Sequence, residues 1–324
     1  MRKTFLIISL LTSMTWVYSQ GPGYSLAFNQ IFDNREYFSS YAFPQTIFGA
    51  RLDASLDFQV DSMHRFYAGF SYLYEHGSTV LGVAPGIILY YQYENDHLDM
   101  TFGSFPRKER IQLPAVFLHD TLQYFRPNVE GARIAYRWNS GMFYSFVDWT
   151  GRVSENRRET FLVGLHSRID VHQFFIEPAF LMYHNARSYN PNDSLPLQDN
   201  GLISGIAGYE VELSHRKIKM EISAGYIASY NRYRPQAFEW NSGMISNIKL
   251  HLGVFGLHGV YYFGGPINFE LGDPFYNSGN YGRMDFFVDP FRKANIDSKI
   301  SWNVHVVPGE GIHHSQQLLI RIEF

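Results

Sequence analysis

Polar and apolar residues alternate strictly over much of the chain. In the last ten residues, SQQLLIRIEF, the side chains of Leu318, Ile320, Ile322 and Phe324 fall on one face of an extended segment. The residues between them fall on the other face, because successive side chains of a strand point to opposite sides. The pattern predicts a two-faced strand that needs a partner for its backbone groups.

The same two-residue period recurs along the whole chain and predicts about sixteen strands, the kind of even number expected of a bacterial outer-membrane barrel. Short turns join alternate pairs, which favours antiparallel hairpins. Counts of fourteen or eighteen strands stay open. The expected strands are 23–32, 45–60, 63–76, 84–95, 97–106, 128–138, 141–151, 158–169, 172–184, 201–214, 217–230, 241–252, 255–264, 282–289, 296–307 and 312–324.

The connections between these strands fall into two classes. Short turns alternating with long loops are typical of a membrane barrel with its short turns in the periplasm. The short turns are expected at 61–62, 95–96, 139–140, 170–171, 215–216, 253–254 and 290–294, and the long loops at 33–44, 107–127, 185–200, 231–239 and 265–281.

The number of strands decides which face is inside. A cylinder of about sixteen strands is too wide for side chains to fill, so its interior holds water and its polar face points inward. The apolar face then meets lipid, and only closure satisfies every backbone group there. We therefore predict an all-β, closed, antiparallel, up-and-down transmembrane barrel in which the first strand pairs with the last. A large soluble β-domain is the alternative.

Composition agrees with this prediction. Tyr and Phe together number 51, and aromatic residues favour strands. The mean hydropathy of -0.20 excludes a protein built of membrane-spanning helices. There is no Cys, and hence neither a lipid-attachment cysteine nor a disulfide framework.

The amino terminus is expected to be an export signal. Arg2 and Lys3 precede the apolar run 5–17, and small residues stand before Gln20. The run is short for a membrane anchor. We predict a signal peptide at 1–19 and a barrel domain at 20–324. The mature chain then has 25 basic and 30 acidic residues, a net charge of -5 that argues against nucleic acid as a partner.

The ending LLIRIEF, apolar at alternate positions and closing on Phe324, resembles the carboxy-terminal signal of Gram-negative outer-membrane β-barrels of the porin-like superfamily. The resemblance extends as a pattern over nearly the whole mature chain and indicates no particular subfamily. It implies that the barrel-assembly machinery recognises the strand that ends at Phe324. Pro178 departs from the pattern, since proline cannot donate to a ladder, and we expect a β-bulge there.

Candidate chemistry is sparse. The chain has 13 His, but no HExxH or GxSxG motif occurs, and the segment around Ser204 is interpreted as a strand of small residues. We therefore expect no enzyme and no cofactor, although a Ser, a His and an acid from distant strands meeting in space stays open. The histidines at 97, 251, 258 and 305 are interpreted as lumen-wall residues, and the pair 313–314 is expected near an outer rim.

Charged side chains on the predicted inward face are nearly balanced in sign, which does not indicate a strongly ion-selective pore. The loop 107–128 mixes basic residues with the apolar stretch 113–118, and we expect it to fold into the lumen or over its mouth as a constriction. Aromatic residues in the loop 265–282 either stack on sugars or pack on one another. The candidate lumen or constriction residues are Arg51, Asp53, Arg107, Lys108, Arg110, Arg126, Arg133, Arg137, Lys219, Glu221, Arg283 and Asp285.

These features together predict an outer-membrane pore for passive diffusion of small hydrophilic solutes, in contact with outer-membrane lipid. Two alternatives stay open: a receptor or surface-assembly scaffold with a blocked lumen, and a barrel hydrolase acting on lipid or peptide at the rim. The sequence does not determine the solute or the oligomeric state.

Overall fold

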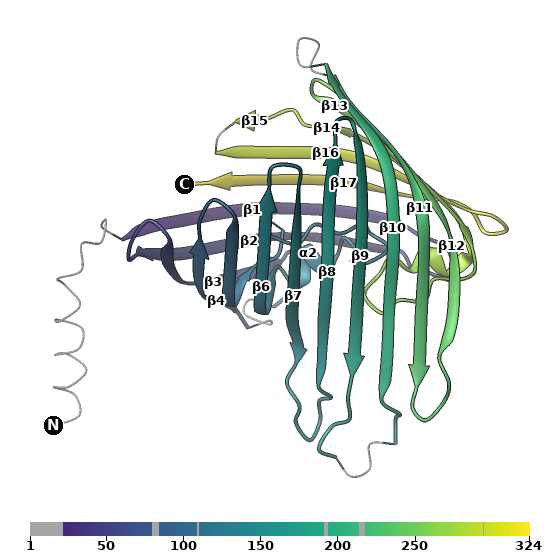
Figure 1. The fold of residues 1–324 in the computed structure, drawn as a ribbon, viewed down its shortest axis with the longest axis horizontal. Helices are drawn as coiled ribbons and strands as arrows, with labels where there is room; N and C mark the ends of the chain where they lie inside the picture. The colour runs from purple at the N-terminus through teal and green to yellow at the C-terminus, as the bar shows by residue number, and fades with distance from the viewer. Residues whose placement is uncertain (1–21, 80–83, 109, 191–193, 214–217, 294) are drawn as a thin grey trace.

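The computed structural model describes residues 22–79, 84–108, 110–190, 194–213, 218–293 and 295–324, and in this part of the chain the strands form one closed antiparallel sheet (Figure 1). One strand, β15 (Arg292–Lys293), is a two-residue piece within a turn. Because β14 pairs directly with β16, sixteen strands make up the barrel, as predicted.

The strands follow the predicted order, and the largest change is at the first strand, which runs four residues further than expected. Their bounds are β1 Gly23–Glu36, β2 Gln45–Gln59, β3 His64–Glu75, β4 Gly86–Glu94, β5 Leu98–Pro106, β6 Asn128–Trp138, β7 Gly141–Gly151, β8 Thr160–Val171, β9 Phe174–Asn185, β10 Gln198–Leu213, β11 Ile218–Tyr233, β12 Glu239–Leu252, β13 Phe255–Gly264, β14 Asn280–Val288, β16 Ile296–Val307 and β17 Gly311–Glu323.

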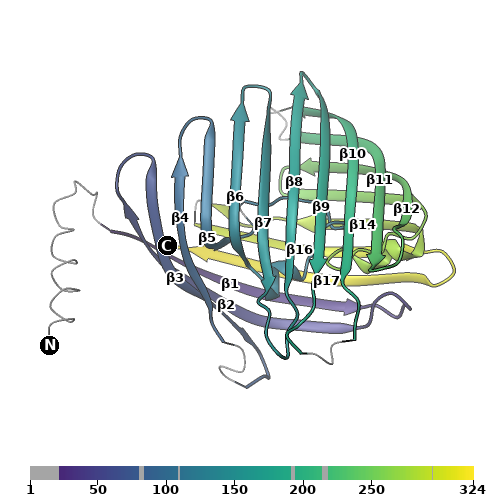
Figure 2. The same cartoon turned by 60° about the horizontal axis from the view of Figure 1, so that its bottom comes forward.

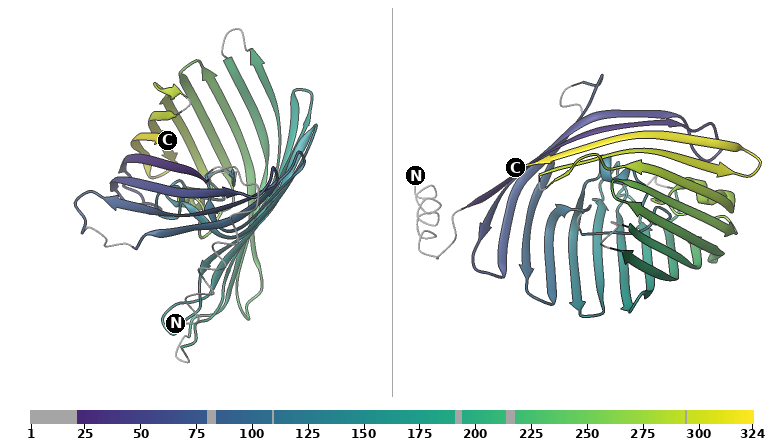
Figure 3. Two further views of the ribbon diagram at one scale, coloured as in Figure 1. Left: turned by 90° about the vertical axis from the view of Figure 1, so that its left-hand side faces the viewer. Right: turned by 90° about the horizontal axis from the view of Figure 1, so that it is seen from above.

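The barrel closes between its first and last strands. β1 pairs with β17 antiparallel from Ala27 opposite Glu323 to Glu36 opposite His314, and the two strands lie side by side in Figure 3. This pairing supplies the partner that the terminal strand requires. In Figure 2, β1, β2 and β17 run across the direction of β6 to β9, as tilted strands on opposite sides of a barrel do.

The predicted faces are confirmed. Large apolar side chains on the outer surface are exposed in the isolated chain, for example Leu56 at 50% and Ile222 at 48%. Charged side chains on the inner face, such as Asp99 and Arg133, are buried. The apolar rows therefore point outward to lipid, and the chain is an outer-membrane β-barrel.

The two classes of connection also appear, with local corrections. The turn expected at 170–171 lies at His172-Gln173, and further connections at 76–85 and 152–159 join the long-loop rim. The turn at 215–216 and the signal peptide at 1–19 lie outside the described residues.

The expected bulge at Pro178 is wrong. The ladder between β8 and β9 is interrupted beside Pro178 but resumes in the same register, because the missing N–H removes a bond without adding a residue. The register shift lies instead between Trp149 and Gly151 on β7.

Within the described ranges, the helical pieces are two short segments in the connections, α2 (Leu122–Phe125) and η3 (Pro274–Ser278). None of the helices in the described ranges has the length and apolar character needed to cross a bilayer.

Two long loops fold into the barrel, as expected for the first of them. Residues 107–127, which carry α2, and residues 265–279, which carry η3, bury apolar side chains inside the wall. Val116, Phe117, Phe275 and Tyr276 are each no more than 2% exposed. The aromatic residues of the second loop thus pack into the interior, and the lumen is partly filled by an apolar core.

Candidate functional site

The two infolded loops hold each other in place through their backbones. The His119 N–H donates to the Leu271 carbonyl at 2.8 Å, and the Asp273 N–H donates to the Ala115 carbonyl at 2.9 Å. A Cβ at Gly272 would clash with the carbonyl oxygen of Val116, so this approach requires glycine.

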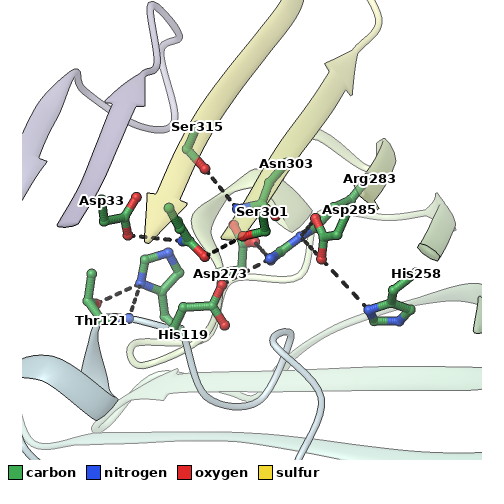
Figure 4. Close-up of polar contacts among 12 residues, drawn as sticks. Asp33, His119, Thr121, His258, Asp273, Arg283, Asp285, Ser301, Asn303 and Ser315 are labelled. Atoms are coloured by element: carbon green, nitrogen blue, oxygen red, sulfur yellow. Dashed lines mark hydrogen bonds and ion pairs between the residues drawn. The ribbon is translucent and has the colours of Figure 1, made fainter. Parts of the chain in front are cut away.

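Arg283 on β14 ties both loops to the wall. Its guanidinium lies 3.0 Å from an Asp120 carboxylate oxygen on the first loop and 3.7 Å from Asp273 on the second. It also bonds Asp285 on its own strand at 2.8 Å (Figure 4). The loops are therefore anchored by a charge network as well as by apolar packing.

The surroundings of the first loop also determine the protonation states of Asp120 and His119. Burial acts to raise the pKa of the Asp120 carboxyl, but the Arg283 guanidinium, through its charge and its hydrogen bond, outweighs burial and lowers that pKa well below its ordinary value. Burial lowers the pKa of His119, whose Nδ1 lies 2.7 Å from the Thr121 hydroxyl. Asp120 is consequently anionic and His119 neutral at pH 7.

Most candidate residues predicted from the sequence are lumen-wall residues paired with a neighbour. Arg51 bonds Asp53 at 3.2 Å, and its guanidinium also donates to the Gln123 carbonyl at 2.6 Å. Further pairs are Arg133 with Asp99 at 2.9 Å, Arg137 with Asp99 at 3.5 Å, Lys219 with Glu210 at 2.9 Å and Glu221 with Lys249 at 2.8 Å.

The four basic residues of the first loop do not form one cluster. Arg107 is buried and bonds Asp148 at 2.5 Å, so it anchors the base of the loop. Arg110 donates to Thr101 and Gln92 on the wall. Arg126 borders a cavity of about 460 Å³ near Trp149, and its carbonyl accepts a hydrogen bond from the Arg107 guanidinium at 3.1 Å.

The lumen space next to the infolded loops includes two neighbouring cavities of about 730 and 470 Å³. Lys108 and Arg110 line both. The larger cavity is also bordered by Arg133, Arg137, Glu221, Arg283 and Asp285, and the smaller by Arg51 and Asp53.

A second polar cluster lies on the opposite, outward face of the wall, at the long-loop rim. We call it the seam cluster: Asn34 and Glu36 on β1, Thr46 on β2, and His314 and Gln316 on β17. The strand register builds it, because Asn34 is the ladder partner of both Gln316 and Thr46, and Glu36 is the partner of His314. Side chains of such partners lie about 5 Å apart at Cβ.

In the seam cluster each side chain donates a hydrogen bond to the next, from Thr46 through Asn34 and Gln316 to His314. The Thr46 hydroxyl donates to Asn34 Oδ1 at 2.8 Å. Asn34 Nδ2 donates to Glu36 Oε1 at 3.1 Å and to Gln316 Oε1 at 2.9 Å. Gln316 Nε2 lies 2.7 Å from His314 Nδ1 and donates to it. In this arrangement a neutral His314 carries its proton on Nε2, while the second carboxylate oxygen of Glu36 can accept.

The next outward row toward the membrane is apolar. Phe32 pairs with Phe48 and with Leu318, and Leu318 pairs with Ile300. The Phe32 and Phe48 rings make an edge contact with centroids 5.7 Å apart. On β1, β2 and β17 the outward side chains therefore change from polar in the seam cluster to apolar in the next row.

Sequence analysis missed the seam cluster because it ended the first strand at residue 32 and assigned Asn34 and Glu36 to a loop. The alternation in fact continues through Glu36, with Asp33 and Arg35 inward. The pair 313–314 is at the outer rim as expected, but His313 points inward and only His314 belongs to the cluster.

In the part of the chain that the structure describes, no group of three or more His, Asp or Glu side chains is arranged to hold a metal ion.

Comparison with known proteins gave one family. Residues 24–308 match the family described as lipid A 3'-O-deacylase-type. No curated protein matched the sequence. The match contradicts the expectation that the chain is not an enzyme, since a deacylase is a hydrolase.

Solved structures of similar fold are outer-membrane proteins. A loop L8 deletion mutant of OmpT from Vibrio cholerae aligns with a TM-score of 0.59 and 8% identity, covering 94% of this chain and 99% of that one. OmpF of Salmonella typhi, in complex with daunomycin, gives 0.55 and 9%, covering 94% and 98%. OprB of Pseudomonas putida gives 0.53 and 8%, covering 98% and 96%. At such identities the likeness concerns the fold alone.

Proposed function

The chain belongs to the lipid A 3'-O-deacylase-type family, and from this premise we propose that it is a hydrolase that removes an ester-linked acyl chain from a lipid of the outer leaflet. One observation carries the proposal: the hydrogen-bonded seam cluster lies on the outward face of the wall, and the next row of side chains on β1, β2 and β17 is apolar. In a membrane, an ester between sugar and acyl chain lies where polar groups give way to apolar chains.

The seam cluster has the groups that ester hydrolysis needs. Glu36 takes a proton from a water molecule as the water oxygen bonds to the carbonyl carbon. His314 donates its Nε2–H to the carbonyl oxygen, on which negative charge develops. The carbon–oxygen bond to the alcohol then breaks, and Glu36 returns the proton to the leaving oxygen. The products are a fatty acid and a lipid with one free hydroxyl.

Asn34 and Gln316 act through these two residues. Asn34 bonds one Glu36 oxygen and leaves the other to accept, and Gln316 keeps the His314 proton on Nε2. They are positioning residues in this scheme.

The test uses purified protein in vesicles that contain lipid A, with the lipid and the released fatty acid measured by mass spectrometry. The expected result is loss of one ester-linked chain, and a rate at least about 100-fold lower for Glu36→Gln. His64→Ala is the matched control, since His64 is an outward histidine at the other rim that bonds Tyr91 at 2.6 Å. Full activity of Glu36→Gln would overturn the proposed site.

A second candidate function is passage of small hydrophilic solutes through the lumen, beside the hydrolase activity. It is favoured by the charged cavities of about 730 and 470 Å³ that remain next to the infolded loops. Deleting residues 111–122 should then raise single-channel conductance in a planar bilayer. Unchanged conductance would count against this function.

A further inference from the structure

An apolar groove of about 640 Å³ lies on the outer surface beside the seam cluster. Its outward lining side chains come from five neighbouring strands, β13, β14, β16, β17 and β1. They are Phe255, Phe286, Val288, Ile300, Trp302, Gln316, Leu318 and Phe32.

The strand register joins the groove to the seam cluster. Phe286, Trp302 and Gln316 are successive ladder partners, and Gln316 in turn pairs with Asn34. A single row of side chains across the wall therefore passes from two aromatic rings to two amides. Gln316 belongs both to the groove and to the seam cluster.

The shape of the groove suits an extended apolar chain. The rings of Phe286 and Trp302 stack with centroids 5.9 Å apart and form one side. The next row of ladder partners forms the other side. The aliphatic side chains of Leu318, Ile300 and Val288 make up the middle of this row, and the rings of Phe32 and Phe255 lie at its two ends. The groove crosses the strands β17, β16, β14 and β13, and at the usual spacing between strands it extends about 15 Å.

We propose that this groove holds the acyl chain of the ester that the seam cluster cleaves. The inference rests on the proposed function and adds to it the part of the protein that selects the chain. Any lipid-facing wall contacts acyl chains, but here the apolar channel ends at Gln316, next to the groups that would act on a carbonyl. The occupant is therefore the chain of the reacting ester, with its carbonyl at Gln316 and its methyl end toward β13.

The length and branching of the acyl chains that are cleaved should then depend on the residues of the groove. In lipid there is no hydrophobic gain on leaving the bilayer for the wall, so selectivity comes from shape. A misfit of one methylene in an apolar site changes rates about tenfold or more. Ile300→Trp would shorten the groove, and Trp302→Ala would widen it.

The experiment measures release of fatty acids from a mixture of lipid esters with chains of different length. Ile300→Trp is expected to lower the rate for long chains at least about tenfold relative to short ones. Trp302→Ala is expected to lower the discrimination between straight and branched chains. Ile222→Trp is the matched control, because it adds the same ring at an outward position on β11, which is 48% exposed.

The outcomes separate the two proposals. If the wild type cleaves esters but all variants keep its chain-length profile, the groove proposal fails and the proposed function stands. If the wild type cleaves no ester, the proposed function fails, and the groove is then tested with a phospholipid that carries a photoactivatable diazirine on one acyl chain. Preferential labelling of residues 300–318 over 218–228 supports the groove, and equal labelling overturns it.

Discussion

Replacing Arg283 by Met should release the infolded loops, because it leaves three carboxylates facing one another in the lumen. The side chains of Arg283, Asp285 and Asp273 are 11%, 9% and 1% exposed. Removing one partner of a buried ion pair costs about 3–5 kcal/mol. The Asp120 side chain is 35% exposed, so solvent screens its share, and we expect a loss near the lower end, about 3 kcal/mol.

The assay is urea-induced unfolding of the barrel in lipid vesicles, followed by tryptophan fluorescence, together with protease cleavage of the loops. Lys219→Met is the control, since Lys219 pairs with Glu210 at 2.9 Å while its side chain is 47% exposed. Such an exposed pair contributes less than about 1 kcal/mol.

The pH dependence of the unfolding free energy provides an independent check, because the direction of its change can be worked out. Because Arg283 holds the pKa of Asp120 below its ordinary value, the wild type has this stabilisation above the unfolded pKa and loses it as pH falls. In Arg283→Met the carboxylates lack their cation, so protonating them relieves repulsion. The difference in unfolding free energy between the two proteins should therefore shrink as pH falls, first as the carboxylates of the variant are protonated and then, below the ordinary Asp pKa of about 4, as the wild type loses its own stabilisation. A difference below about 1 kcal/mol at pH 7, or one that does not change with pH, would refute the reasoning.

Three further predictions concern the loops and the seam cluster. Arg107→Ala leaves Asp148 buried without its cation and should cost about 3 kcal/mol, with faster protease cleavage of the loop 107–127; resistance equal to the wild type would contradict the anchoring role. Gly272→Val should cost about 1–3 kcal/mol in urea unfolding, because its side chain meets the Val116 carbonyl; an unchanged midpoint would show that the loops can separate freely. His314→Ala should lower kcat about 100-fold with little change in KM, since it donates mainly to the developing charge, and an effect on KM alone would argue against that role.

Much of the fold follows from the sequence alone. The two-residue period, the short turns and the polar face predicted the antiparallel barrel, the outward direction of the apolar rows and the closure of β1 on β17. Each of these depends on local alternation and on the need to satisfy every backbone group in lipid, and both can be read along the chain. The infolding of the loop 107–127 was also predicted, from its apolar stretch.

The seam cluster depended on tertiary structure. Asn34 and His314 are 280 residues apart in the chain. Only the register of the closing strands places Gln316 beside Asn34 and Glu36 beside His314. No short motif marks such a site, because its members come one or two at a time from three strands.

By itself, therefore, the sequence determined a lipid-facing barrel whose polar residues line an interior. Tertiary structure decided which of those polar residues are already paired inside, which loops fill the lumen, and which few polar groups face outward beside an apolar groove. The physical reason is that alternation depends on neighbours along one strand, whereas a site on a sheet depends on the register between strands that the chain brings together only when the barrel closes.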